Sequence, residues 1–367
     1  MTNSLPSFRD KNQVKALLEA IRRLVTTHWN IMEICGGQTH AIARYRLEEL
    51  LPESLQLIHG PGCPVCVTPE TLLDDAVAIA TNPEVIFTTF GDMLRVPGSS
   101  YSLMQVKSQG ADVRMVYSPL DAVKIARQNP HRQVVFFGIG FETTAPVNAL
   151  SIDVANRLNL QNYSLLSSIV TVPPAIRMLK EDDDNQINAL LAAGHVCVVA
   201  GYQPYHSLAF DYQMPISITG FEPADILWGI YNCVEMLETH KVEVRNAYPR
   251  MVKESGNTAA LALMNRIFEI SDSEWRGIGC IPQSGLRIRK EYELYDASLR
   301  FKIASKKKSE MKVCRSGDIL KGRITPYSCP EFGHGCTPEH PLGASMVSSE
   351  GTCSAFYRYR PIIKKVI

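Results

Sequence analysis

The sequence predicts an α/β protein built on parallel sheets. Short apolar segments alternate with segments whose apolar residues recur at helical spacing, and this pattern continues up to residue 237. Turns that contain glycine or proline separate the two kinds of segment. Alternating strands and helices favour parallel sheets with helices on both faces. Because 45% of the 367 residues are hydrophobic, the chain can fill more than one core.

The elements follow one another in a regular order. Residues 12–27 carry an apolar helical stripe, 31–34 form an apolar strand, and 41–51 form a helix after a Cys-Gly-Gly turn. Further strands are expected at 55–58, 85–90, 113–116, 134–137, 165–170, 196–200 and 216–219. Further helices are expected at 69–81, 119–128, 145–158, from 172 onward, and at 224–237, 242–254 and 258–270, before an irregular stretch at 277–282.

The chain divides into three parts. The segments 85–96 and 134–144 resemble each other, since an apolar strand, Phe and Gly precede an acidic residue in both. We therefore expect two similar Rossmann-like lobes, residues 1–118 and 119–237. Residues 238–367 form a third part that is helical and then irregular, with little apolar surface to bury near its end. A bound metal centre there would supply folding energy.

Charge and composition exclude several classes of protein. The 38 basic and 37 acidic residues nearly cancel, and the only basic run is Lys306-Lys307-Lys308, so neither nucleic acid nor an anionic membrane is an expected partner. The chain shows no signal peptide and no stretch of the roughly 20 apolar residues that cross a bilayer, which predicts a cytoplasmic protein. Ten cysteines in a reducing compartment indicate metal or catalytic roles.

The Cys63-Pro-Val-Cys66 sequence lies in a turn between the strand 55–58 and the helix 69–81. Thr68 is the expected cap of that helix, with Pro69 at its first position. The two sulfurs would then lie at the positive end of a helix, which favours thiolate over thiol. Redox or metal chemistry is the favoured interpretation, and a stapled turn or half of a zinc site is the alternative.

Cys35 and His40 form a second candidate pair. Cys35 follows a strand, at the end where open α/β sheets place their ligands. The thiolate and the imidazole can share a metal, or the histidine can act as a base or orient a ligand. A Cys-His protease is disfavoured because no oxyanion-hole signature accompanies the pair.

Four late cysteines form a third group, spaced Cys314-x14-Cys329-x6-Cys336-x16-Cys353. Four thiolates in turn-rich sequence suit a zinc ion or a 4Fe-4S cluster, and the wide gaps favour the cluster. His334 and His340 lie among them and are expected at the surface or behind the ligands. A polar set at later strand ends predicts either a ligand cleft or helix caps: Asp92, Glu142, Thr143, Thr144, Gln203 and His206. Cys197 and Cys233 are expected in the core.

With these motifs in place, the chain resembles the HypD family of NiFe-hydrogenase maturation proteins over nearly its whole length. The resemblance rests on Cys35-Gly-Gly-Gln-Thr-His40, Gly60-Pro-Gly-Cys-Pro-Val-Cys66, Gly140-Phe-Glu-Thr-Thr144, the four late cysteines, Pro338-Glu-His-Pro-Leu-Gly343 and Ser349-Glu-Gly-Thr-Cys353. The cysteine positions show no departure from the family pattern.

The resemblance implies a scaffold on which an iron with two cyanides and one carbon monoxide, Fe(CN)2CO, is assembled with a small HypC-type partner and a HypE-type cyanide donor. It implies that Cys35 ligates the iron, that His40 binds or orients it, and that Cys63 and Cys66 are a redox pair which ligates the iron or cycles beside it. Cys314, Cys329, Cys336 and Cys353 would hold a 4Fe-4S cluster that relays electrons to that pair. Glu350 would handle protons or support the ligands.

Two alternatives from other classes remain. The protein could be a thiol-disulfide oxidoreductase with a structural four-cysteine zinc site, or a binding module whose cysteines only hold its shape. The colour of the anaerobically purified protein separates the cluster from zinc.

Overall fold

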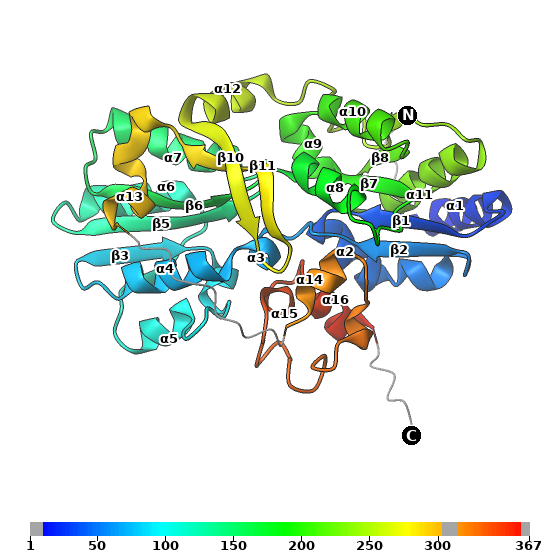
Figure 1. The fold of residues 1–367 in the computed structure, drawn as a ribbon. Helices are drawn as coiled ribbons and strands as arrows, with labels where there is room; N and C mark the ends of the chain where they lie inside the picture. Colours follow the sequence, from blue (N-terminus) through cyan, green and yellow to red (C-terminus); the bar gives the residue numbers. More distant parts are fainter. Residues whose placement is uncertain (1–9, 303–313, 361–367) are drawn as a thin grey trace.

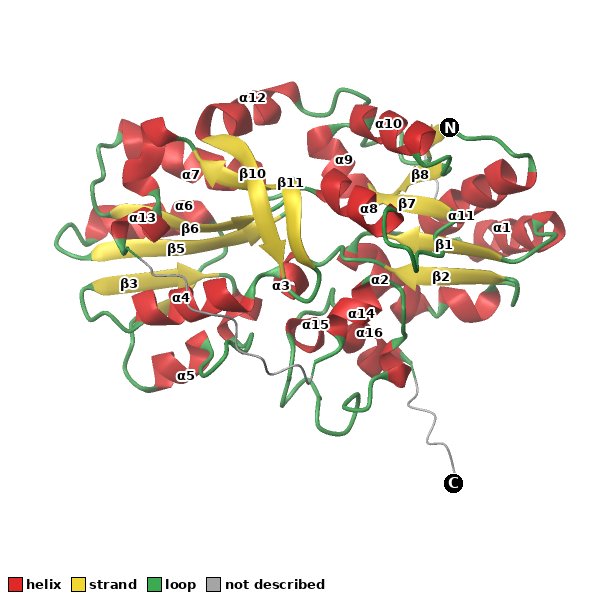
Figure 2. Ribbon diagram, in the orientation of Figure 1, coloured by secondary structure: helices red, strands yellow, loops and turns green. Residues whose placement is uncertain are grey.

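The computed structural model describes residues 10–302 and 314–360. Two parallel sheets lie side by side, and a long hairpin crosses between them (Figure 1). The first sheet has the order β2-β1-β7-β8-β9 and the second β4-β3-β5-β6. Helices flank both sheets (Figure 2), so the predicted α/β class with parallel sheets is confirmed.

The strands of the first sheet are β1 (Trp29–Glu33), β2 (Leu55–His59), β7 (Ala189–Ala193), β8 (Ile216–Thr219) and β9 (Val244–Asn246). Those of the second are β3 (Val85–Thr89), β4 (Val113–Met115), β5 (Gln133–Gly140) and β6 (Tyr163–Ile169), and the hairpin is β10 (Phe268–Trp275) with β11 (Gly279–Ile288).

The helices of the first half are α1 (Lys11–Leu24), α2 (Gly36–Tyr45), η1 (Leu47–Leu50), α3 (Pro64–Val67), α4 (Glu70–Ala80), η2 (Gly91–Leu94), α5 (Leu103–Ser108), α6 (Pro119–Gln128), α7 (Ala145–Arg157) and α8 (Val172–Lys180). Those of the second half are α9 (Gly194–Ala200), α10 (Gln203–Asp211), α11 (Pro223–Glu238), α12 (Thr258–Ile267), η3 (Lys290–Tyr295), α13 (Ala297–Arg300), α14 (Ser316–Leu320), η4 (Pro326–Ser328), α15 (Ala344–Val347) and α16 (Thr352–Tyr359).

Strand pairing divides the chain differently from the predicted ranges 1–118 and 119–237. The chain leaves the first sheet after β2, builds the whole second sheet, and returns to the first sheet with β7 beside β1. The apolar pattern of buried parallel strands gives their number but not their neighbours, which is why consecutive halves of the sequence were expected to form the lobes.

Several predicted elements differ from the structure, among them the helix expected at 258–270, which ends at Ile267 where β10 begins. The strand expected at 196–200 lies in helix α9, and the preceding run Ala189–Ala193 is the fully buried strand β7. The helix expected at 242–254 contains β9 instead, and the irregular stretch 277–282 belongs to the β10-β11 hairpin. A short apolar run fits a buried strand and a buried helix equally well, and periodicity alone does not separate them.

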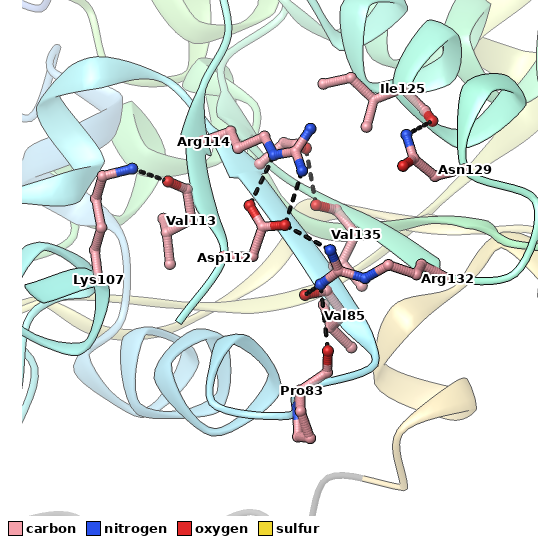
Figure 3. A network of polar contacts seen from close by, with 11 residues as sticks. Pro83, Val85, Lys107, Asp112, Val113, Arg114, Ile125, Asn129, Arg132 and Val135 are labelled. Atoms are coloured by element: carbon pink, nitrogen blue, oxygen red, sulfur yellow. Dashed lines mark hydrogen bonds and ion pairs between the residues drawn. The ribbon is translucent and has the colours of Figure 1, made fainter. Parts of the chain in front are cut away.

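The amino end of the second sheet is fastened by a charged network (Figure 3). Asp112 accepts hydrogen bonds from Arg114 and Arg132, each at 2.7 Å, and the Arg114 bond lowers the pKa of Asp112. Arg132 also donates to the carbonyl oxygens of Pro83 (3.2 Å) and Val85 (2.9 Å). This network therefore ties β3, β4 and β5 together at the end of the sheet opposite the ligand-binding end.

The C-terminal helices α14, α15 and α16 lie beneath the first sheet, where α16 contacts α2 and α15 contacts α3 (Figure 1). Within residues 10–302 and 314–360, every helix is too short or too polar to span a bilayer.

Candidate functional site

Cys35 lies at the carboxyl end of β1 and caps the amino end of α2. Its side chain is buried, and its Sγ atom lies 3.5 Å from Nδ1 of His195 at the start of α9. The His195 ring also packs against Phe221, with ring centroids 5.1 Å apart. The carboxyl ends of β1 and β7 therefore bring together a thiol and an imidazole that are distant in the sequence.

The loop that carries Cys63 and Cys66 runs directly against Cys35. The Gly36 N–H donates to the Gly62 carbonyl at 2.8 Å, and a Cβ on Gly62 would overlap the backbone of Cys35. Cys63 and Cys66 are both buried and are joined by a disulfide with Cα atoms 5.2 Å apart. The expected convergence of the three early cysteines at neighbouring strand ends is thus observed.

The cap of the following helix is shifted from its predicted position. Cys63 caps the short helix α3, and Cys66 donates its N–H to Cys63 Sγ at 3.2 Å. Helix α4 then begins at Glu70, and its cap is Pro69 rather than Thr68. The two sulfurs therefore lie at the short helix α3 and not at the amino end of the longer helix α4, where they were expected.

The electrostatics of the pocket keep Cys35 protonated. Burial raises the pKa of the Cys35 thiol well above its usual value, and the negative charges of Glu33 and Glu350 raise it further. Burial lowers the pKa of His195 to about 4. At neutral pH a thiol therefore faces a neutral imidazole, which has a lone pair that can accept a proton or bind a metal.

Glu350 reaches this pocket from the C-terminal segment. A Cβ on Gly36 would lie 2.5 Å from the Cβ of Glu350, so the two residues are in contact next to Cys35. The Glu350 side chain has solvent-exposed surface, yet protein surrounds its carboxyl group closely enough that desolvation, together with the charge of Asp92, raises its pKa. Glu350 is thus a wall of the pocket, and its carboxyl group keeps its proton to a higher pH than an ordinary glutamate does.

The contacts of His40 are with the C-terminal segment. Its Nδ1 lies 3.1 Å from the Ser349 carbonyl oxygen and its Nε2 lies 3.5 Å from the Tyr359 hydroxyl. Its ring also meets the Tyr359 ring edge-on. Of the two histidines, His195 is therefore the one in contact with Cys35. Sequence reasoning missed it because the strand that presents it was expected after it, at 196–200.

The four late cysteines line one small cavity of about 20 Å³. The Leu342 N–H donates to Cys336 Sγ at 3.4 Å, and a Cβ on Gly343 would overlap Cys314 Sγ. Burial raises the pKa of Cys353 well above its usual value, and the charges of Cys314, Cys336 and Cys329 add to this shift. Among residues 10–302 and 314–360, no three His, Cys, Asp or Glu side chains are arranged to hold a metal ion.

The hairpin tip joins the two cysteine centres. The Arg276 N–H donates to the carbonyl of Val67, the last residue of α3, at 2.8 Å. Gly277, the next residue of the tip, lies against Gly317, because a Cβ on Gly277 would be 3.0 Å from the Gly317 Cα. Gly317 belongs to α14, the helix that begins two residues after Cys314. Cys314 is also close enough for its charge to act on the buried Arg276 guanidinium. A second link is the segment from Glu350 to Cys353, which runs from the Cys35 pocket to the four-cysteine cavity.

The later polar set is spread over several places. Glu142 is buried, accepts the Val172 N–H at 3.0 Å as a cap of α8, and has its pKa raised to about 7 by burial. His206 is exposed and lies 3.3 Å from Glu254. Cys197 and Cys233 are buried, as expected for core residues.

Comparison with known proteins gives a consistent result over nearly the whole chain. Residues 12–360 match the model of the HypD family, described as "Hydrogenase formation hypA family". A hydrogenase maturation factor HypD of Rhodobacter capsulatus is 47% identical over 364 residues, which cover 96% of this chain and 97% of that protein. The factor of the same name in Escherichia coli (strain K12) is 44% identical over 361 residues, covering 96% of this chain and 97% of the relative.

Proposed function

This chain belongs to the HypD family of hydrogenase maturation factors, and from that premise we propose that it is the scaffold on which the Fe(CN)2CO unit of a NiFe hydrogenase is assembled. The observation that carries the proposal is the convergence of Cys35, Cys63 and Cys66 at the ends of β1 and β2. A metal-building scaffold needs a thiol that binds its substrate iron beside a group that exchanges electrons with it.

The iron is the substrate, and Cys35 is its protein ligand in this proposal. Thiolates suit low-spin ferrous iron that carries cyanide and carbon monoxide, because all of these ligands are soft. The thiol has a raised pKa and must lose its proton when iron binds. The neutral His195 imidazole, 3.5 Å away, is placed to become a second ligand, because its lowered pKa leaves its lone pair free at neutral pH. His40, which was the expected partner from the sequence, would act by holding the C-terminal segment.

The four late cysteines are the proposed holders of a 4Fe-4S cluster. The chemistry of the donor set suits such a cluster, because Cys314, Cys329, Cys336 and Cys353 line one cavity and backbone N–H groups point at Cys336. When bound, the cluster would supply single electrons. The protein contributes the path, through the hairpin tip at Arg276 and through the Glu350–Cys353 segment.

Those electrons would open the disulfide. The Cys63–Cys66 bond would take up two electrons and two protons to become two thiols. Reoxidation of the pair to the disulfide would release the same two electrons and two protons, which is enough to cleave one cyano group from a sulfur atom of the donor, giving one cyanide for the iron and one thiol on the donor. An external one-electron donor must re-reduce the cluster. Glu350 is placed to hand over protons, because it borders Cys35 and has a raised pKa.

The proposed partners are a HypC-type protein, which would share the iron with Cys35, and a HypE-type protein, which would deliver cyanide. A maturation factor requires partners in its pathway, and the iron at Cys35 would need further ligands from outside this chain. We propose that both partners approach the pocket formed by Cys35, His195 and Glu350.

The disulfide at the start of α3 also suits the alternative, a thiol-disulfide oxidoreductase with a structural zinc site. The two functions separate in one experiment: anaerobic purification with its partners, followed by iron and sulfide counting and infrared spectroscopy. Iron-bound cyanide and carbonyl bands support the scaffold. A colourless protein that contains zinc, with no such bands, contradicts it.

Cys63→Ala and Cys66→Ala variants test the relay itself. Both should bind the cluster and iron, yet assemble much less of the dicyanide iron unit, as measured by the infrared bands per iron. Normal assembly in these variants would rule out the relay and leave the disulfide a structural role.

A further inference from the structure

Glu33, the last residue of β1, has a carboxylate that is fully buried and surrounded by donors. One oxygen accepts the Cys35 N–H at 2.9 Å. The other accepts hydrogen bonds from the Thr39 hydroxyl and from Nδ1 of His59, the latter at 2.7 Å. These donors come from α2 and from the residue just before the Gly60–Cys66 loop, so one side chain joins both cysteine-bearing segments.

The backbone of Glu33 makes the same connection. Its carbonyl accepts the Gly60 N–H at 2.8 Å, which extends the β1-β2 pairing by one step beyond His59. The Gly36 N–H then bonds to the Gly62 carbonyl, so Cys35 is enclosed between two cross-links to the loop. Between these two cross-links Gly62 lies directly against the backbone of Cys35, where a Cβ would overlap it.

The network continues outward from His59. Its Nε2 lies 3.4 Å from Glu48, and Glu48 forms an ion pair with Arg360 after α16. The His59 ring also meets the Phe356 ring edge-on at 5.3 Å. The C-terminal segment thus supports the ring that holds Glu33.

From these contacts we propose that Glu33 is the positioning residue of the site, which fixes Cys35 against the loop that carries Cys63. Burying a carboxylate is unfavourable unless donors satisfy it, and an apolar side chain would fill the same space without that cost. A carboxylate is needed here because its two oxygens accept hydrogen bonds from Cys35, Thr39 and His59 at the same time. The inference deepens the proposed function, since it concerns the geometry in which Cys35 would hold iron beside the redox pair.

Two variants separate the length of the Glu33 side chain from its charge. Glu33→Gln keeps the length: its amide oxygen can accept the Cys35 N–H, and its amide N–H can donate to His59 Nδ1 in the other tautomer. Glu33→Asp keeps the charge but is one methylene shorter, so it cannot reach both partners. A positioning role therefore predicts that Gln preserves the site and Asp does not, whereas a role for the charge predicts the reverse.

The readout is the rate at which Cys35 and Cys63 form a disulfide in the full chain. In a Cys66→Ser background, diamide removes two electrons and two protons from the reduced thiols, and peptide mass spectrometry follows the Cys35–Cys63 product. Glu33→Gln should react within about twofold of the parent. Glu33→Asp should be about tenfold slower or more, because misplacing reacting groups by ~1 Å costs up to about a hundredfold. Alkylation of the exposed Cys280 is the internal control for general reactivity.

Equal rates in the two variants, or a fast Asp with a slow Gln, overturn the proposal. So does the absence of a Cys35–Cys63 product with Glu33 intact, and so does a Glu33→Gln protein that fails to fold, since the charge would then be what matters. The assay needs neither iron nor a partner. If the wild-type chain binds no iron, the proposed function fails while the positioning result stands.

Discussion

Gly62 lies against the backbone of Cys35 so closely that there is no room for a side chain. The two segments are joined there by the hydrogen bond from the Gly36 N–H to the Gly62 carbonyl at 2.8 Å. Since Cys63 is the next residue, this approach sets the separation between the proposed iron ligand and the disulfide.

Replacing Gly62 by alanine should push the Cys63–Cys66 loop away from Cys35. We expect a destabilisation of about 1–3 kcal/mol from overpacking, measured by urea unfolding. Ferrous iron bound per chain should fall strongly, while the visible absorption of the four-cysteine centre persists. Gly91→Ala is the matched control, because its Cβ would meet only the flexible thioether of Met115, at 3.0 Å. Equal iron binding in the two variants would contradict this account.

Iron loading at Cys35 and cluster binding by the four late cysteines should be lost independently of each other. Cys35→Ala should abolish loading of the substrate iron and keep the brown colour of the cluster. Cys353→Ala should remove the colour, because Cys353 is a buried wall of the four-cysteine cavity. Iron and sulfide counts with absorption spectra check both. Loss of colour in Cys35→Ala would show that the two sites are divided wrongly.

Much of this site could be predicted from the order of elements. Cys35 and the Cys63–Cys66 pair each follow a strand, and parallel neighbours end on the same side of a sheet, so their convergence needs only that β1 and β2 pair. The gathering of the four late cysteines followed from their density in a turn-rich segment. The expectation that this segment has little apolar surface to bury was wrong, because Ile319, Phe332, Met346 and Phe356 form a buried cluster with Cys336 and Cys353.

His195 could not be predicted in the same way. It lies two residues after the end of β7, the strand beside β1. Apolar residues run on both sides of Gly194-His195, so the apolar pattern does not show which of the two runs is the strand. The β10-β11 hairpin was missed because the apolar spacing of α12 continues to Ile270, past the point where the helix ends. The pairing of β7 with β1, which returns the chain to the first sheet, depends on tertiary packing, and the local spacing of apolar residues does not predict it.

The two histidines should have different roles. Replacing His195 by alanine removes the imidazole 3.5 Å from Cys35 Sγ, and we expect iron affinity to fall about 10–100-fold, as for groups that support metal ligands. His40→Ala removes the contacts to Ser349 and Tyr359, so amide hydrogen exchange in α16 should speed up while iron affinity changes less. Anaerobic ferrous titration and exchange mass spectrometry separate the two. A larger loss of affinity in His40→Ala would restore His40 as the residue that acts on the iron.

The buried Glu142 should make the protein less stable as pH rises. Its pKa is about 7 in the folded chain against 4.5 for an ordinary glutamate, so the folded state binds more protons than the unfolded state between these values. Stability is therefore lost as the pH rises through that window.

Glu142→Gln keeps an acceptor for the Val172 N–H and does not ionise, so it should match the wild type near pH 4.5 and be more stable by up to about 3 kcal/mol at pH 8. Urea unfolding at both pH values measures the difference, with the exposed Glu254→Gln as a control that should show no such change. If wild type and Glu142→Gln lose stability in parallel between the two pH values, Glu142 is ionised in the folded protein and its burial does not control this pH dependence.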